Sequence, residues 1–504
     1  MSEPSKFCDD AIETRVSTAI ARAAQAQVSW ANRSLDERIE QVRALAQVLL
    51  GSAEEAVVIL SEETGRSKTE SRLSEIATVK EYVEDAIRTA RVALSVEKVR
   101  LSALDFPKKK GKIEMIPRGV IGVIAPWNYP LMQFYKSLFP ALLAGNAVVL
   151  KPSELAPRAG EWLAEKCREV LPEGLVELLS GGGDVGVALV KGGLDGVVFT
   201  GSVATGRSVA EACARQLIPC SVELGGKDAA IVLEDCDFDR TVAGVLWAGM
   251  HNCGHDCAAV ERVYVVNSIA DRFVTALGDA AKRLDVFPQG RCDIGTVQNA
   301  RQLKTIEEHV SDALEKGARV IAGGSRINDG LGYYPTVLDG CTHEMRVVTE
   351  ETFGPVIAVI RVQDGDEGVR AANDSQYGLN GSVWTQDISK GQSLAGRLQV
   401  GVAHVNNHKW TGGTLAHTPW TGIKDTGFGV AGSRHAYHLF ARPRLLMWDG
   451  NTKPEPFWLP MNEDLEQFSK ALIQRGRGQF SALFKLLPLL GKRVKAVTEF
   501  VRGE

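Results

Sequence analysis

A cysteine at the start of an apolar, β-branched segment is the first candidate for chemistry in this sequence. Cys257 ends the segment 250–257, Met-His-Asn-Cys-Gly-His-Asp-Cys, and the strand-like stretch Val260–Val266 follows it closely. A thiol that is reached through a Gly-containing turn and held by a rigid strand can face a substrate together with backbone N–H groups. Most cysteines of reduced proteins are inert core residues. The hypothesis that Cys257 is a nucleophile therefore depends on residues elsewhere in the chain.

Two other segments present polar side chains at the ends of apolar strands. Asn128 follows the predicted strand 121–126 in a turn bracketed by prolines. There its amide can donate a hydrogen bond to an oxyanion, or it can satisfy its own turn. Glu223 lies on a second apolar strand, before two glycines. A half-buried carboxylate can act as a general base, and the alternative is an ion pair with Lys227 or another cation.

Two further strand ends have features of a nucleotide site. Lys151 and Glu154 stand three residues apart at the end of one strand, where they can hold the two ribose hydroxyls of an adenosine or simply be solvated. Residues 199–206 indicate a strand, a turn with Gly201 and Ser202, and a helix start whose free N–H groups attract a phosphate. This segment lacks the G-x-G-x-x-G spacing, so alone it is not specific for a nucleotide.

The elements that position these residues alternate between strands and helices. Apolar residues at helical spacing indicate helices over 11–93, and strand, turn and helix then alternate from residue 119. Such alternation predicts parallel strands with crossover helices, hence an α/β fold with doubly wound sheets. The predicted strands are 119–126, 147–151, 196–200, 222–224 and 229–233 before Cys257, and 260–266, 319–323, 356–362, 381–384 and 400–405 after it.

Residues 101–118 interrupt this alternation. Two short strand-compatible pieces flank the segment Phe106–Lys112, which predicts a β-hairpin with a basic tip. We expect this hairpin to contact another subunit.

The composition is that of an ordinary globular protein. The chain has 504 residues, of which 44% are hydrophobic and 24% charged, and its formal net charge is -4. These values predict two or three domains and disfavour nucleic acid as a partner. The first residues show no signal peptide, no apolar run approaches the ~18 residues of a membrane span, and nine irregularly spaced cysteines indicate free thiols. We therefore expect a cytoplasmic protein.

Taken in order, these segments resemble the aldehyde dehydrogenase superfamily from about residue 10 to about residue 448. Seven segments in sequence follow patterns of that superfamily, which chance does not supply. The patterns P-W-N-[FY]-P, K-P-S-E, F-T-G-S-x-x-x-G, E-L-G-G-K, N-x-G-x-x-C, E-E-x-F-G-P-V and P-x-x-G-x-K-x-[ST]-G-x-G occur at Pro126–Pro130, Lys151–Glu154, Phe199–Gly206, Glu223–Lys227, Asn252–Cys257, Glu350–Val356 and Pro419–Gly429.

The resemblance implies a role for each catalytic candidate. Cys257 would be the nucleophile, Glu223 the base that activates water, and Asn128 with the backbone N–H of Cys257 the oxyanion hole. The implied reaction oxidises an aldehyde to a carboxylic acid through a thiohemiacetal and a thioester. Hydrolysis is expected rather than transfer to coenzyme A, because relatives that pass on the acyl group often lack this base.

The resemblance also implies a nicotinamide cofactor. Because the carboxylate of Glu154 would accept from a ribose 2′-OH and repel a 2′-phosphate, NAD is favoured over NADP. The implied contacts are Lys151 and Glu154 with the adenine ribose, Gly201, Ser202 and Trp127 with the pyrophosphate, Glu351 with the nicotinamide ribose, and Phe353 with the nicotinamide.

For the whole chain we expect two doubly wound parallel-sheet domains, a small β oligomerisation arm and a helical C-terminal extension. The assembly implied is a homodimer or homotetramer, with a small-molecule aldehyde as substrate. The predicted boundaries are 1–97 and 119–224 for the cofactor-binding domain, 98–118 with part of 430–448 for the arm, 225–403 for the catalytic domain, 404–429 for a return to the domain interface, and 449–504 for the extension.

The chain departs from the family at several positions. Met250 and His255 stand where Phe and Gln are usual, which leaves the wall of the substrate pocket and the polarity beside the cysteine open. Val430 replaces a frequent Arg, and the sequence near Arg442 shows no second Glu of the kind that some members use as a proton relay.

Two rival interpretations concern the same residues. His251, Cys253, His255 and Cys257 form a set of ligands compatible with zinc, but their spacing within one short segment disfavours a metal site. A catalytically silent member of the superfamily is the other rival, and the retention of all three catalytic candidates disfavours it.

The C-terminal extension contains an apolar run, Phe480–Leu490, followed by three cations within 491–495. The run is too short to span a bilayer. It can pack on the enzyme or on a neighbouring subunit, or the segment 480–495 can lie on a membrane surface with its cations at anionic headgroups.

Overall fold

The computed structural model describes residues 6–102, 105–286, 292–409 and 415–503. The chain forms two compact units, of which the first comprises Met1–Ser95 and Met115–Arg442 and the second comprises Val96–Glu114 and Pro443–Glu504. Residues 1–5 of the predicted segment 1–97 and residues 410–414 of the predicted segment 404–429 lie outside the described residues.

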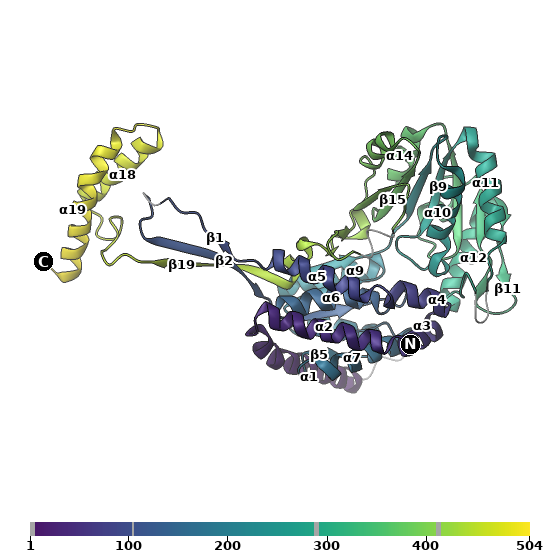
Figure 1. The fold of residues 1–504 in the computed structure, drawn as a ribbon, viewed down its shortest axis with the longest axis horizontal. Helices are drawn as coiled ribbons and strands as arrows, with labels where there is room; N and C mark the ends of the chain where they lie inside the picture. The colour runs from purple at the N-terminus through teal and green to yellow at the C-terminus, as the bar shows by residue number, and fades with distance from the viewer. Residues whose placement is uncertain (1–5, 103–104, 287–291, 410–414, 504) are drawn as a thin grey trace. The chain divides into compact units, whose positions relative to one another are not determined.

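The first lobe of unit 1, the lower of its two lobes in Figure 1, is built on a parallel sheet with the strand order β5-β4-β3-β6-β7. β3 and β4 are buried along their whole length. Such continuous apolar runs are typical of parallel strands that helices cover. The strands are β3 (Val120–Ile124), β4 (Ala147–Lys151), β5 (Val176–Leu178), β6 (Gly196–Thr200) and β7 (Cys220–Glu223).

Helices surround this sheet, and α1, α6, α7, α8 and α9 contact its strands. The start of α2 shows how the sequence sets a helix end, because Ser34 and Glu37 form a capping box. The helices are α1 (Lys6–Ala31), α2 (Leu35–Gly51), α3 (Ala53–Thr64), α4 (Lys68–Ser71), the π-helix η1 (Arg72–Ile76), α5 (Val79–Ala93), α6 (Met132–Ala144), α7 (Pro157–Val170), α8 (Gly183–Lys191) and α9 (Val203–Gln216).

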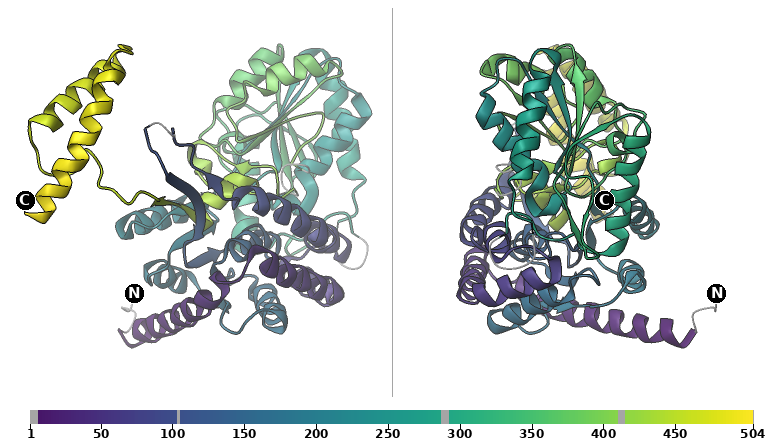
Figure 2. Two further views of the ribbon diagram at one scale, coloured as in Figure 1. Left: turned by 60° about the vertical axis from the view of Figure 1, so that its left-hand side comes forward. Right: turned by 90° about the vertical axis from the view of Figure 1, so that its right-hand side faces the viewer.

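The second lobe contains a seven-stranded sheet of order β10-β13-β14-β9-β8-β15-β16, with helices on both sides (Figure 2). Its strands are parallel except for the edge strand β10, which pairs with β13 in the antiparallel sense. The strands are β8 (Asp228–Val232), β9 (Val260–Val266), β10 (Arg319–Ala322), β13 (Thr336–Asp339), β14 (Val356–Val362), β15 (Asn380–Trp384) and β16 (Val402–Val405).

The remaining elements of unit 1 are the helices of the second lobe and several short pieces. The helices are α10 (Phe238–Met250), α11 (Asn267–Lys282), α12 (Ala300–Glu315), α13 (Arg346–Thr349), α14 (Gly365–Asn373) and α15 (Ile388–Ala395). A short helix of the first lobe, α17 (Tyr437–Phe440), packs against α6. The short pieces are β11 (Arg326–Ile327), β12 (Gly332–Tyr333), β17 (Trp420–Thr421), β18 (Val430–Ala431), and the 3-10 turns η2 (His251–Gly254), η3 (Lys424–Thr426) and η4 (Arg434–Ala436).

The two lobes meet where β7 ends and β8 begins. Only the segment 224–227 separates these strands. The carboxyl ends of β3, β6 and β7 therefore face the loop that leads into the amino end of β9. In open α/β sheets, ligands bind at the edge formed by the carboxyl ends of the strands.

Unit 2 contains a three-stranded sheet of order β1-β2-β19 and two helices. A small apolar core of Phe468, Ala471 and Leu486, with Leu465, Leu489 and Leu490 packed against it, joins the helices. The elements are β1 (Glu97–Lys98), β2 (Lys109–Pro117), β19 (Ala441–Asp449), α18 (Glu463–Gly476) and α19 (Ala482–Arg502); the last residues of β2 and the first of β19 belong to unit 1.

The predicted α/β class with doubly wound sheets is confirmed, and most predicted strands differ from the observed ones by a few residues at most. The predicted tip of the hairpin is wrong, because Lys109–Lys112 belong to strand β2. Lys109 forms ion pairs with Asp449 and Glu455, so β2 continues as a partner of β19 and does not end in a turn there.

Among the described residues, no single helix is long and apolar enough to cross a membrane. One bent pair, α2 with α3, meets the length and composition criteria when its two helices are taken together.

Candidate active site

Cys257 lies in a tight loop between η2 and β9. Asn252, Cys253 and Gly254 all adopt left-handed backbone conformations, with φ of 57°, 55° and 68°. A Cβ at position 254 would stand 2.0 Å from the carbonyl oxygen of Gly354, so only glycine fits there. The loop is therefore held directly against the segment that carries Glu351 and Phe353.

The thiol of Cys257 faces two carboxylates. Its Sγ is 3.7 Å from Oε1 of Glu223 and 3.9 Å from Oδ1 of Asp256. Burial, and then the negative charges of Glu223 and Asp256, raise the pKa of the thiol well above its usual value. The resting group is therefore a neutral thiol, and a base must remove its proton before it can act as a nucleophile.

Glu223 is placed to be that base. It is the last residue of β7, and its Oε1 accepts a 2.6 Å hydrogen bond from Nε1 of Trp420. The sequence allowed an ion pair between Glu223 and Lys227, but Lys227 pairs with Glu261 and donates to Thr352. The carboxylate of Glu223 is thus oriented by a neutral donor and faces the thiol.

The amide of Asn128 points to the loop of Cys257, away from its own turn. Its Nδ2 donates to the carbonyl oxygen of His255 at 3.1 Å, and Asn252 Nδ2 donates to the carbonyl oxygens of Asn128 and His255 at 3.0 and 2.9 Å. An amide group has two N–H donors, so the contact with His255 leaves a second donor for an oxyanion. Asn128 and Cys257 line the same cavity.

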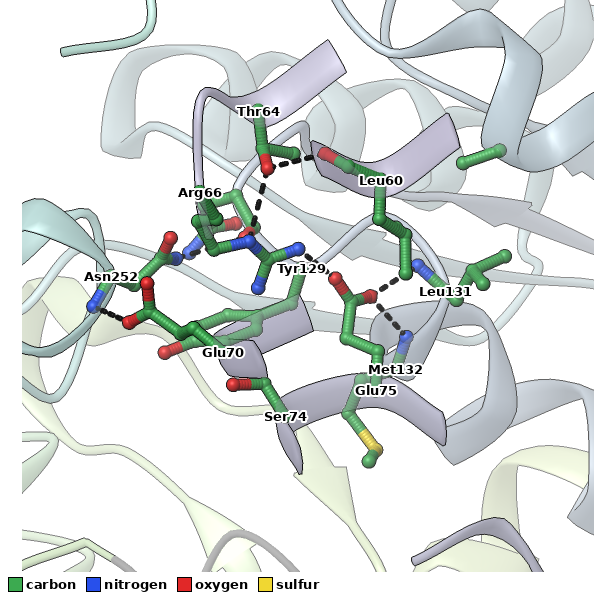
Figure 3. Close-up of polar contacts among 12 residues, drawn as sticks. Leu60, Thr64, Arg66, Glu70, Ser74, Glu75, Tyr129, Leu131, Met132 and Asn252 are labelled. Carbon is green, nitrogen blue, oxygen red and sulfur yellow. Dashed lines mark hydrogen bonds and ion pairs between the residues drawn. The ribbon is translucent and has the colours of Figure 1, made fainter. Parts of the chain in front are cut away.

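Buried charges of the N-terminal helices support both of these segments (Figure 3). Glu70 accepts a hydrogen bond from the backbone N–H of Asn252. Glu75 accepts from the backbone N–H groups of Leu131 and Met132 at 2.7 and 3.0 Å, at the start of α6, and pairs with the buried Arg66. Helix α4 and the π-helix η1 thus anchor the loop before Cys257 and the turn after Asn128.

Two cavities are lined by Cys257. Cys257 is the only described residue that lines both of them. The first encloses about 650 Å³ and the second about 740 Å³, each counted with its opening to solvent. A group in one cavity and a group in the other can therefore meet at the sulfur atom.

The first cavity has a wall that is largely apolar and aromatic. Leu73, Met132, Trp247 and Trp420 contribute to it, together with polar residues such as Lys136. Nζ of Lys136 lies 5.0 Å from the centre of the Trp420 ring and makes a cation–π contact with it.

A polar cluster closes the first cavity beside the thiol. Nζ of Lys409 donates to Oδ2 of Asp256 at 2.7 Å, and the hydroxyl of Tyr129 donates to the same carboxylate at 2.9 Å. His251 Nδ1 lies 3.2 Å from the Tyr129 hydroxyl. Although burial opposes it, the charge and hydrogen bond of Lys409 hold the pKa of Asp256 below its usual value, so Asp256 carries a negative charge.

The second cavity carries features of a dinucleotide site. Gly201 and Ser202 line it at the start of α9, where Ser202 caps the helix by accepting from the N–H of Thr205. A helix start of this kind favours a phosphate. Trp127 and Phe353, which both line the cavity, pack edge to face with ring centres 5.5 Å apart.

Glu351 completes this cavity next to the link between the lobes. Its Oε1 accepts from the N–H of Gly226 at 2.8 Å, and a Cβ on Gly225 would stand 2.5 Å from its Oε2. Glycine at 225 is what lets the carboxylate approach the backbone. Burial and the nearby charge of Glu261 raise the pKa of Glu351 to about 8.

Lys151 and Glu154 are not among the residues that line this cavity. Lys151 is buried at the end of β4, where Nζ donates to the carbonyl oxygens of Pro152 and Gly181 at 2.9 Å each. Glu154 is exposed. The structure therefore brings together the other cofactor candidates and leaves these two at the end of the neighbouring strand.

His255 and Met250, the two residues of the cysteine segment that depart from the family pattern, have structural roles. His255 Nδ1 donates to the carbonyl oxygen of Phe353 at 2.7 Å, and Nε2 accepts from the N–H of Gln298 at 3.1 Å. Burial lowers the pKa of His255 to about 4, so the ring is neutral. Met250 is buried in the core of the second lobe and does not line the first cavity.

The candidate metal ligands of this segment point to different partners. His251 faces Tyr129 and Ser74, Cys253 is buried, and His255 faces Phe353. Within the described ranges, no three His, Cys, Asp or Glu side chains are grouped so that they hold a metal ion.

Several residues of the site were not indicated by the sequence. Asp256, Tyr129, Lys409 and Trp420 all lie within 4 Å of the catalytic candidates or of one another. Tyr129 and Asp256 lie inside recognised patterns, at positions next to Asn128 and Cys257. Trp420 lies inside the pattern of residues 419–429 at a position that the pattern leaves open, and Lys409 lies outside every pattern. The partners of both are more than a hundred residues away.

Known proteins were compared with the chain at three levels. A profile of the aldehyde dehydrogenase family matches residues 4–445. A 4,4'-diapolycopene aldehyde oxidase of Methylomonas sp is 35% identical over 92% of this chain and 89% of its own length. A putative succinate-semialdehyde dehydrogenase [NADP(+)] of Mycobacterium ulcerans (strain Agy99) is 38% identical over 82% of this chain and 80% of its own.

Solved structures agree with the sequence comparisons. A putative aldehyde dehydrogenase from Anabaena variabilis has a TM-score of 0.83 and 32% identity, and covers 89% of this chain and 96% of its own. The betaine aldehyde dehydrogenase of Staphylococcus aureus, determined in complex with NAD+, has a TM-score of 0.81 and 30% identity over 89% of this chain and 90% of its own. The resemblance found in the sequence is confirmed: the chain belongs to the aldehyde dehydrogenase family and is an oxidoreductase that acts on aldehydes.

Proposed function

We propose that the protein oxidises an aldehyde to a carboxylic acid with a nicotinamide dinucleotide as hydride acceptor, through a covalent adduct on Cys257. The observation that carries this proposal is the junction at Cys257. Its thiol lies 3.7 Å from the carboxylate of Glu223 and lines both cavities, one of which also contains Asn128. A thiol, a base and an amide donor are the parts that acyl chemistry at a carbonyl requires.

The residues of the chain act in a definite order. Glu223 takes the proton of the Cys257 thiol, and the thiolate attacks the carbonyl carbon of the aldehyde. The second N–H of Asn128 and the backbone N–H of Cys257 donate to the alkoxide of the thiohemiacetal. The bound cofactor supplies the hydride acceptor that this oxidation to a thioester requires.

Hydrolysis of the thioester is the second task of Glu223. After it has released the first proton to solvent, its carboxylate takes a proton from water, and the hydroxide attacks the acyl carbon. The hydrogen bond from Trp420 keeps the carboxylate turned toward Cys257. The products are a carboxylic acid and the free thiol.

The second cavity fits a nicotinamide dinucleotide. Its lining combines the start of α9, two aromatic side chains and a buried carboxylate against a backbone of two glycines. Gly201, Ser202 and Trp127 would hold the pyrophosphate, and Glu351 and Phe353 the nicotinamide half. We place Lys151 and Glu154 at the adenine ribose and favour NAD over NADP, although the mycobacterial relatives are named for NADP.

The proposed substrate is an aldehyde with an apolar body. Leu73, Met132, Trp247 and Trp420 supply the wall along which this body would lie. The Methylomonas relative is named for a diapolycopene aldehyde and the mycobacterial relatives for succinate semialdehyde. The wall favours an apolar aldehyde over succinate semialdehyde, because an anionic substrate would be desolvated against aromatic rings.

We also propose a homodimer or homotetramer in the cytoplasm. Members of the family are generally oligomeric, and the arm of β1, β2 and β19 is the part that we assign to the contact. Light scattering of the purified protein measures the mass of the assembly, and fractionation of cells measures its compartment.

The test of the proposed function is NADH and NADPH production by the purified protein with aldehydes graded by chain length, aromaticity and charge. We expect turnover with apolar aldehydes, and faster turnover with NAD than with NADP. Cys257→Ala should abolish turnover and leave cofactor binding nearly unchanged, whereas Cys253→Ala, the matched control, should retain most of it. Glu154→Gln should lower the ratio of turnover with NAD to turnover with NADP.

Loss of activity in Cys253→Ala with activity retained in Cys257→Ala would overturn the assignment of the nucleophile. Turnover restricted to carboxylate-bearing aldehydes would overturn the apolar substrate class without affecting the mechanism.

A further inference from the structure

The end of α18, the turn after it and the start of α19 bear apolar side chains that the structure leaves exposed. Phe480, Phe484 and Leu487 are 79%, 81% and 65% exposed, and Leu472 and Ile473 at the end of α18 are exposed as well. We call these five residues the apolar tip. Large apolar groups gathered in this way mark an interaction surface.

The apolar tip is not a by-product of the core between the two helices. Leu486, together with Phe468 and Ala471, already fills that core. Phe480, Phe484 and Leu487 stand at helical spacing of four and three residues, so they form a stripe on a different side of the chain from Leu486. Nothing in the packing of α18 against α19 requires these side chains to be large or apolar.

Cations accompany the apolar tip. Residues 467–498 contain seven Lys and Arg residues and no Asp or Glu. Lys470, Arg475 and Lys495 form ion pairs with acids outside this segment. In the described part of unit 2, Arg477, Lys485 and Lys492 have no such partner within 4 Å, and two of them flank the exposed phenylalanines.

A second exposed group is held in place near the other end of the helices. The guanidinium of Arg493, which is itself buried, donates to the carbonyl oxygens of Pro456 and Trp458 and to Oδ1 of Asn462 at 2.5 to 2.8 Å. These bonds tie the loop 456–462 to α19. The exposure of Phe457 and Trp458 on that loop is therefore a feature of an ordered surface.

We propose that the α18–α19 hairpin binds the surface of a membrane that contains anionic lipids. The apolar tip enters the boundary between headgroups and acyl chains, and Arg477, Lys485 and Lys492 contact the lipid phosphates. Apolar groups bordered by cations are the usual composition of an interfacial anchor. Two copies of the hairpin meeting tip to tip would instead bring like charges together.

The inference is tested on the full-length protein by co-sedimentation with vesicles. One set contains phosphatidylcholine only, and the other contains phosphatidylcholine with about a third of phosphatidylglycerol. We expect binding to the second set and not to the first. Raising the salt concentration to about 0.5 M should weaken it, because salt screens the attraction between the cations and the phosphates.

Two double variants separate the apolar contribution from the charged one. Phe480→Ser with Phe484→Ser should reduce the vesicle partition coefficient by at least about tenfold. Lys485→Gln with Lys492→Gln should reduce the partition coefficient by about fivefold for each cation removed, at low salt. The matched controls are Leu217→Ser and Lys80→Gln, which change exposed residues of unit 1. Turnover of a short, soluble aldehyde checks that each variant is folded.

Three results would overturn the proposal. The first is that the full-length protein remains in the supernatant with anionic vesicles, and the second is that both double variants bind as strongly as the unaltered protein. The third is that the phenylalanine variant changes the mass of the assembly in light scattering while vesicle binding is absent, which would assign the apolar tip to a contact between copies of the chain. These outcomes are independent of the catalytic proposal, because they do not involve the site at Cys257.

Discussion

Burial and two neighbouring negative charges set the reactivity of the Cys257 thiol at the junction of the two cavities. Glu223 and Asp256 both stand within 4 Å of Cys257 Sγ, and both favour the neutral form of the thiol. Only Glu223 lacks a charged partner among its described contacts and is able to accept a proton. Asp256 is held ionised by Lys409, so its effect on the thiol is that of a permanent negative charge.

Replacing Asp256 by Asn should make Cys257 more reactive toward neutral alkylating agents. The change removes a negative charge near Sγ, so the pKa of the thiol falls and more thiolate is present at a given pH. We expect the pH profile of alkylation by iodoacetamide, followed by mass spectrometry of the Cys257 peptide, to move down by about one unit or more. Asp239→Asn, at an exposed position, is the control. An unmoved profile would mean that Lys409 cancels the field of Asp256.

Replacing Glu223 by Gln should separate the two halves of the reaction. The amide can take a proton neither from the thiol nor from water, so both halves should slow at neutral pH. At a pH high enough for hydroxide to deprotonate Cys257, one equivalent of NADH should still form, while hydrolysis stays slower by about 10²- to 10⁴-fold. Rapid mixing measures the burst, and intact mass should detect the thioester on Cys257. Equal loss of the burst and of the steady state at that high pH would count against a role in hydrolysis.

At the scale of elements, the N-terminal helices act on a site to which they contribute no catalytic group. Glu70 at the end of α4 and Glu75 in η1 bind the backbone of the loop before Cys257 and of the turn after Asn128. The left-handed backbone of Asn252 and Cys253 is sparsely populated and persists where the surroundings determine it.

Replacing Glu70 by Ala should destabilise this loop more than replacing it by Gln. Ala leaves the buried N–H of Asn252 without an acceptor, at a cost of about 1–3 kcal/mol, whereas Gln keeps an acceptor oxygen. Denaturant unfolding measures the difference, with the exposed Glu40→Ala as the control. The turnover number of Glu70→Ala should fall as well, and Gln should restore most of it. Identical unfolding of the Ala and Gln variants would remove this role from Glu70.

The elements themselves were largely predictable from the sequence. β3 and the first four residues of β4 are continuous buried apolar runs, and such runs leave little choice of secondary structure. β5 has three residues, Val176–Leu178, too few for a periodic signal. The basic tip of the hairpin was placed wrongly because the acids that pair with Lys109 lie at 449 and 455, more than three hundred residues away.

The site was predictable only as far as its patterns reach. The patterns named Cys257, Glu223 and Asn128, and the structure brings all three to one junction. They gave no sign of the contacts of Trp420 and Lys409, which exist only because a distant segment folds back over the cysteine loop. The tautomer of His255 is likewise set by Phe353 and Gln298, both remote in sequence.

At the scale of the whole molecule, the short link 224–227 joins the two lobes, and its residues Leu224 and Gly225 line the second cavity. Gly225→Ala should weaken cofactor binding by about tenfold, because its Cβ would displace Glu351 and overpacking of this kind costs of the order of 1–3 kcal/mol. Fluorescence titration with NAD measures the affinity. Alkylation of Cys257 should be unchanged, and Gly183→Ala, where a Cβ meets open space, is the control. Unchanged affinity in Gly225→Ala would place the nicotinamide half elsewhere.

The two cavities share one described residue, and this has a consequence for inhibitors. A compound that fills the aldehyde side contacts the wall of Leu73, Met132, Trp247 and Trp420, none of which touches the other cavity. An electrophile carried on an apolar body would reach the sulfur from this side, and cellular concentrations of dinucleotide would not compete with it.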